Sequence, residues 1–138
     1  MKQKTVIPAI MFLTGGVLYG IIEVCFRGYT HPTMIVAGGL CAVFISYLTN
    51  TSIKFYLKVT LSALFITFIE FLFGCVFNLA LNMNVWDYSD QPFNILGQVC
   101  PLFLGLWAGL SVLALHLVKQ LQNGLKNTQK IMLTKSKH

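Results

Sequence analysis

Charged side chains are scarce in this 138-residue chain, and acidic ones are the scarcest. Asp, Glu, Lys and Arg make up 10% of the residues, and only four of these are acids, whereas a typical soluble domain has roughly 25% charged residues. The mean hydropathy is +0.72. A soluble domain of this length could not bury so much apolar surface. The composition therefore excludes a soluble protein and predicts a single integral membrane protein domain.

The apolar residues form runs that lack the alternating pattern of half-buried β-strands. Four runs cover about 5–26, 33–48, 55–81 and 99–118. A helix crosses the hydrocarbon layer with about 20 residues, and four strands are too few to close a transmembrane barrel. We therefore predict an all-α, polytopic protein with four transmembrane helices in residues 1–118, followed by a basic tail in residues 119–138.

Basic residues are absent from almost all of one predicted membrane side. Nine of the ten Lys and Arg residues precede the first run, separate the second from the third, or follow the fourth. Because Lys and Arg concentrate in cytoplasmic segments, we expect a multi-pass protein of the bacterial plasma (inner) membrane with both termini cytoplasmic. Charges placed between apolar runs argue against a nucleic-acid partner. The tail from Lys119 either lies on anionic lipid headgroups or stays solvated.

Several patterns of catalytic and metal-binding proteins are missing. The chain has no C-x-x-C, no His at metal-ligand spacing, no nucleophile with a recognisable base, and no P-loop. We expect no metal and no cofactor, and the sequence leans against an enzyme. The cysteines are interpreted as small buried side chains, with a Cys25–Cys100 disulfide near the outer face as the alternative.

Two glutamates stand inside apolar runs, where an ionised group is costly unless it is paired, hydrated or neutralised. Residues spaced by three or four share a helix face, so one polar stripe holds Tyr19, Glu23 and Arg27, and another holds Thr67, Glu70, Gly74 and Asn78. If both stripes turn inward, the carboxylates line an outer-leaflet cavity that binds a cation or a proton. In the structural alternative, Glu23 pairs with Arg27, and Glu70 bonds a nearby Tyr, Trp or backbone group.

Two spacing patterns recur along the chain. The stretches IIEVCFRG from Ile21 and FIEFLFG from Phe68 each carry a glutamate, then an aromatic residue and a glycine. They suggest a two-helix pseudo-repeat of the kind found in transporters. The spacing G-x-x-x-G occurs in the first helix (Gly16, Gly20) and again in the fourth (Gly105, Gly109). It predicts close helix packing at both places.

The connection before the fourth helix is the most polar stretch of the outer side. Trp86 and Tyr88 suit a membrane–water boundary, and Asp87 is placed to bridge to Arg27 and close the cavity as a lid. We expect the cavity mouth to be shaped by Trp86, Tyr88, Ser89, Asn94 and Trp107.

A longer pattern runs through residues 86–107, with the form W-D-Y-S…F-N…G…W and the residues Trp86, Asp87, Tyr88, Ser89, Phe93, Asn94, Gly97 and Trp107. Together with Glu23 and Arg27, and with Thr67 and Glu70, it resembles the putative ABC-transporter type IV family over about 16–115. The resemblance implies a small four-helix membrane protein linked to transport. Since this chain has no P-loop, an ABC system would need a separate ATPase partner.

The leading hypothesis is a membrane protein that binds or transports a small cationic or polar solute. Its predicted ligands are Glu23, Glu70, Arg27, Asp87, Tyr19 and Asn78. The alternatives are a non-catalytic accessory subunit of a membrane complex and a lipid-directed membrane enzyme. Because four short helices barely enclose a pathway, we expect a homo-oligomer in the lipid bilayer.

Overall fold

Four long helices make up most of the chain, as the apolar runs predict. The computed structural model describes residues 3–136. It contains α1 (Gln3–Arg27), α2 (Pro32–Thr49), α3 (Phe55–Phe73) and α4 (Pro101–Lys135), and α3 continues directly into a π-helix, η1 (Gly74–Ala80). The segments Val6–Arg27, Pro32–Thr49, Phe55–Ala80 and Pro101–Lys135 are long and apolar enough to cross a membrane. The predicted all-α membrane fold is confirmed.

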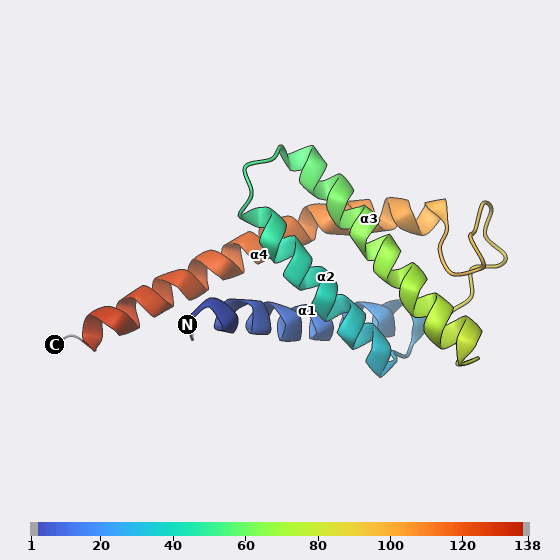
Figure 1. The fold of residues 1–138 in the computed structure, drawn as a ribbon, viewed down its shortest axis with the longest axis horizontal. Coiled ribbons are helices and arrows are strands. Elements are labelled where there is room, and N and C mark those ends of the chain that lie inside the picture. The colour runs from blue at the N-terminus through green and yellow to red at the C-terminus, as the bar shows by residue number, and fades with distance from the viewer. Residues whose placement is uncertain (1–2, 137–138) are drawn as a thin grey trace.

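The helices pack as two pairs joined by α2. Helix α1 packs against α2 and α3 packs against α4, each pair crossing at an angle, while α2 also contacts both α3 and α4 (Figure 1). The core between them is apolar and comes from three helices: Ala37, Cys41, Ile45 and Leu48 of α2, Ala63, Ile66 and Ile69 of α3, and Trp107 and Leu115 of α4. Many large apolar side chains point outward from every helix, as a surface in contact with lipid requires. The predicted pseudo-repeat stays a prediction.

The bundle has two chemically different ends. We call the end with the connection 28–31 and the loop 81–100 the loop end, and the end with the connection 50–54 the lysine end. Helix α4 begins at the loop end, where Pro101 occupies its first turn, and runs past the lysine end beyond the other helices (Figure 1). The boundary expected at residue 118 falls inside this continuous helix.

Glycines of α1 let it approach α2 closely. A Cβ on Gly16 would lie 2.6 Å from the backbone oxygen of Ile35, so that position has no room for a side chain. In α4 the same spacing marks no close contact within residues 3–136, because a Cβ on Gly105 or Gly109 would meet nothing within 4 Å. Those two glycines lie on an open face of the helix, and the spacing alone did not distinguish the two cases.

Alanine substitutions are expected to affect stability differently at the packed glycine of α1 and at the open-face glycine of α4. Gly16→Ala should destabilise the protein by about 1–3 kcal/mol, the usual cost of forcing extra volume into a packed contact. Gly109→Ala should be neutral or slightly stabilising, because alanine favours the helix over glycine. Denaturant-induced unfolding of the two variants in the same detergent measures the difference. Equal effects would contradict the close α1–α2 contact.

The cysteines do not pair in this structure. All four are free thiols, with Cys41 and Cys100 buried, Cys75 partly buried and Cys25 exposed. The Cys25–Cys100 disulfide is therefore not formed. The interpretation as small buried side chains holds best for Cys41 and Cys100.

Candidate functional site

The first part of the site lies at the end of α1, where Glu23 is 6% exposed. Arg27, one turn further along, places Nη1 at 3.7 Å from Glu23 Oε1. The hydroxyl of Thr30, in the connection to α2, donates a 2.9 Å hydrogen bond to Glu23 Oε2. The i, i+4 spacing offers this ion pair as the structural alternative to a ligand role for Glu23, whereas Thr30 has no signal in the sequence.

The second carboxylate belongs to α3 and is buried more deeply. Glu70 is 3% exposed. Its Oε1 accepts a 3.0 Å hydrogen bond from the hydroxyl of Tyr88, and its Oε2 accepts a 2.9 Å bond from Nε1 of Trp107. Three elements therefore meet at this side chain: α3, the loop 81–100 and α4. Each carboxylate oxygen has one neutral donor.

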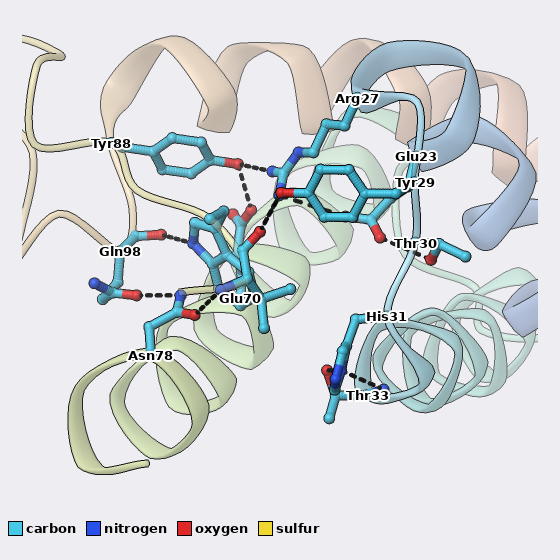
Figure 2. Close-up of polar contacts among 12 residues, drawn as sticks. Glu23, Arg27, Tyr29, Thr30, His31, Thr33, Glu70, Asn78, Tyr88 and Gln98 are labelled. Carbon is cyan, nitrogen blue, oxygen red and sulfur yellow. Dashed lines mark hydrogen bonds and ion pairs between the residues drawn. The ribbon is translucent and has the colours of Figure 1, made fainter. Parts of the chain in front are cut away.

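Tyr88 connects the two carboxylates through Arg27. Arg27 Nη2 donates a 2.8 Å hydrogen bond to the Tyr88 hydroxyl oxygen, which in turn donates to Glu70 (Figure 2). We call the chain of contacts Glu23–Arg27–Tyr88–Glu70–Trp107 the loop-end network. Burial, and then the negative charge of Glu70, raise the pKa of Tyr88. Its hydroxyl therefore stays protonated at neutral pH and remains able to donate.

A pair of buried amides fixes the loop 81–100 on the bundle. Asn78, in the π-helix η1, accepts a 2.7 Å bond from the backbone N–H of Val85 and donates a 2.8 Å bond to Gln98 Oε1. The backbone oxygen of Gln98 accepts a 3.0 Å bond from Nε1 of Trp86. Gly74 makes room for this contact, since a Cβ there would lie 2.9 Å from Gln98 Cβ. The polar stripe that begins with Glu70 on α3 therefore continues into η1, where its residues hold the loop 81–100.

The loop itself is well packed rather than merely interfacial. Val85, Trp86 and Tyr88 are 4–5% exposed, and they pack in one cluster with Met34 and Cys100. The guanidinium carbon of Arg27 lies 5.9 Å from the centre of the Trp86 ring, within the range of a cation–π contact. Trp86 and Tyr88 are therefore buried between the loop and the helices, and their place at the membrane–water boundary stays a prediction.

Asp87, Ser89 and Asn94 are three predicted site residues that lie at the outer turn of the loop, away from the loop-end network. Asp87 is exposed and accepts bonds from the N–H and the hydroxyl of Ser89, and Asn94 bonds the backbone oxygen of Gln91 at 2.8 Å. The expected bridge from Asp87 to Arg27 is wrong: within residues 3–136 Arg27 forms its ion pair with Glu23. These three residues shape the outer turn of the loop instead.

The carboxyl group of Asp87 should titrate at unusually low pH. Hydrogen bonds from the Ser89 hydroxyl, and then from the Ser89 backbone, lower the pKa of Asp87. Since the pKa is lower in the folded state, the stabilisation of this turn is present above the ordinary Asp pKa and is lost as pH falls through the lowered value. NMR titration of ¹³C-labelled aspartate should show this, and Ser89→Ala should raise the midpoint. An unchanged midpoint in that variant would contradict the assignment.

The site is closed in this structure. The void beside Glu70 measures about 10 Å³ and also touches Tyr19, which is at the limit for holding one water. A larger space of about 330 Å³ lies between α1, α2 and α4, and Tyr19 and Trp107 form part of its wall. Glu23 lines neither of these two spaces, and Glu70 lines only the smaller one. The packed loop occupies the place where the sequence predicted an outer-leaflet cavity.

A second polar cluster lies at the lysine end and has no signature in the sequence. Gln122 of α4 is 3% exposed. Its Nε2 donates a 3.0 Å bond to the backbone oxygen of Ser46, and its Oε1 accepts a 2.8 Å bond from Thr49. This contact extends the packed part of α4 beyond its apolar run. A glutamine in a lysine-rich segment is expected to be solvated when only the sequence is considered. The contact of Gln122 follows from the extent of α4 beyond its apolar run, which the hydropathy pattern does not predict.

The fold and the site together define a multi-pass helical membrane protein with two carboxylates held inside its helix bundle. The family described as putative ABC-transporter type IV matches residues 2–136. The chain belongs to this family, which confirms the resemblance found in the sequence. A comparison with curated proteins found no match, and a comparison with solved structures found none.

Proposed function

We propose that this protein binds and moves a small cationic solute across the membrane, with Glu23 and Glu70 as its ligands. The observation that carries the proposal is the charge balance of the loop-end network. Two carboxylates, 6% and 3% exposed, lie in spanning helices, and Arg27 is the one cation in ion-pair contact with either of them in residues 3–136. An intramembrane acid without its own counter-ion is characteristic of ion and substrate pathways.

The loop 81–100 supplies the gate in this proposal. Tyr88 and Arg27 hold the place between the carboxylates, so the structure corresponds to a closed state. When the loop lifts, Glu70 loses the Tyr88 donor and faces the opening together with Glu23. A solute cation then replaces the guanidinium of Arg27 at the carboxylates. Backbone strain supports a loop with more than one conformation, because Phe93 and Leu96 have φ values of +57° and +53°, which are costly for such side chains.

Uptake of the guanidinium ion into proteoliposomes tests this function. The probe matches the group that already lies between the carboxylates. We expect uptake by the wild-type protein and at least a tenfold loss in Glu23→Gln and in Glu70→Gln, since each removes a ligand charge without changing side-chain size. Asp90→Asn is the matched control, because it removes one negative charge from an exposed position in the loop 81–100. Full uptake by both glutamate variants would refute the proposal.

A second candidate, an accessory subunit of an ABC system, is favoured by the length of α4. This helix continues to Lys135 and projects beyond the other helices at the lysine end (Figure 1). Its projecting part offers a surface on which a separate ATPase could bind. Site-specific cross-linking from Gln129 in the host membrane would test it. Capture of an ATPase would support an accessory role, and capture of lipid alone would count against it.

A further inference from the structure

A small basic pocket lies at the lysine end, on the opposite side of the bundle from the loop-end network. Its volume is about 130 Å³, and α2, α3 and α4 all contribute to its wall. The lining residues are Thr49, Phe55, Lys58, Leu115, His116 and Lys119. Three of these six side chains carry nitrogen donors, and none is acidic. Nothing in the loop-end network uses this pocket.

The positive charge of the pocket is not balanced by the chain itself. The four acids of the chain are Glu23, Glu70, Asp87 and Asp90, and they belong to the loop-end half of their helices or to the loop 81–100. Lys58 Nζ donates to the backbone oxygens of Thr49, at 3.3 Å, and Thr51, at 2.8 Å. These neutral acceptors position the ammonium group without cancelling its charge.

The histidine of the pocket is oriented by its neighbours. His116 Nδ1 lies 2.8 Å from the backbone oxygen of Val112, which can only accept, so Nδ1 carries a hydrogen and Nε2 is left for another partner. The ring of Phe55 packs against it at a centroid distance of 5.3 Å. Helix α3 also begins here without a side-chain cap. Its first N–H groups and its dipole add to the attraction for an anion.

Exposed aromatic side chains place the pocket at the depth of lipid headgroups. Tyr47 is 68% exposed, Tyr56 is 60% exposed and Phe55 is 47% exposed. All three lie near the helix ends that flank the connection 50–54. Tyrosines gather at the boundary between hydrocarbon and water, so an occupant of the pocket would lie at that level.

We propose that this pocket is a binding site for a phosphate group, held by the ammonium groups of Lys58 and Lys119, with the Nε2 atom of His116 accepting a hydrogen bond from the O–H of the phosphate. Basic pockets between spanning helices suit lipid phosphates, and the apolar wall of Leu115 and Phe55 suits the acyl chains of a lipid. A free phosphate ion offers the same chemistry without the apolar part. The site is independent of the solute pathway proposed above.

Binding can be measured on the full-length protein in a neutral detergent. The probes are short-chain phosphatidic acid, inorganic phosphate and, as the zwitterionic comparison whose phosphate is a diester without an O–H, phosphatidylcholine of the same chain length. We expect phosphatidic acid to raise the melting temperature of the wild-type protein and Lys119→Gln to weaken its binding about tenfold. Lys119→Arg should retain binding. The control is Lys130→Gln, which removes an exposed lysine from the same helix outside the pocket.

The results show whether the site exists and whether its phosphate comes from a lipid or from the free ion. A response to phosphatidic acid alone assigns the site to lipid, and an equal response to inorganic phosphate assigns it to the free ion. Two results would overturn the proposal: no response to either probe, or an equal loss in Lys119→Gln and Lys130→Gln. The second result would mean that only the general charge of α4 attracts the anion.

Discussion

Replacing Arg27 by glutamine is expected to destabilise the protein by about 3 kcal/mol or more, because breaking a buried ion pair leaves its partner charge uncompensated. Arg27 is 22% exposed at its side chain and Glu23 is 6% exposed, so water screens the pair only weakly. The same change removes the donor to Tyr88. Equilibrium unfolding of the variant in mixed detergent micelles measures the loss.

A double-mutant cycle shows whether this loss comes from the ion pair. Glu23→Gln in the Arg27→Gln background removes the stranded charge, so the double variant should regain a large part of the lost stability. Arg27→Lys is a further comparison. A lysine has a single charged nitrogen, so it cannot contact Glu23 and Tyr88 through two separate nitrogens as the guanidinium does. Additive losses in the double variant would contradict the pairing.

Tyr88→Phe should loosen the loop 81–100 with the removal of one oxygen atom. The change leaves Glu70 Oε1 without its donor and Arg27 Nη2 without its acceptor. Hydrogen bonds to charged groups contribute about 1.5–3 kcal/mol each. A loss of about 3 kcal/mol corresponds to roughly 100-fold more frequent opening. The amides of Val85 and Tyr88, which bond Asn78 and Gly97 in the closed loop, should exchange faster by that factor.

Tyr29→Phe is the matched control for this experiment. The Tyr29 hydroxyl donates a 3.1 Å bond to the backbone oxygen of Val85, so it also ties the loop to the bundle. However, Tyr29 is 54% exposed and its bond is to a neutral group, which contributes only about 0.5–1.5 kcal/mol. Its effect on exchange should be about tenfold or less. Equal acceleration in both variants would show that Tyr88 has no special role in closing the loop.

Composition and helix period predicted most of the fold. The apolar runs placed all four helices, because crossing a membrane requires long uncharged segments with their backbone bonds satisfied internally. The C-terminal extent of α4 was missed. Its apolar run ends near 118, and the later lysines gave no hydrophobic signal, although Gln122 is buried against Ser46 and Thr49. The change from α3 to the π-helix η1 also has no sequence signature in this chain.

The sequence indicated the contacts of the site between residues one helix turn apart, but it did not indicate which residues far apart in the chain would meet. Glu23 and Arg27 are one turn apart on a helix, so spacing alone paired them. Gln98 lies 20 residues from Asn78 and Trp107 lies 37 residues from Glu70, and such contacts depend on how helices and loop pack. Asp87 was given the wrong partner because opposite charge suggested a bridge, whereas its neighbour Ser89 satisfies it locally.

The central claim is that one guanidinium lies between Glu23 and the hydroxyl of Tyr88 beneath the loop. The sequence allows a direct test, because Arg27 is its sole arginine and Glu23 and Glu70 are its only glutamates. Solid-state NMR in lipid, with ¹⁵N-arginine, ¹³C-carboxyl glutamate and ¹³Cζ-tyrosine, measures the dipolar couplings of the guanidinium nitrogens. We predict coupling to one glutamate carboxyl, lost in Glu23→Gln but kept in Glu70→Gln, and coupling to one tyrosine. A guanidinium coupled to neither group would contradict the account.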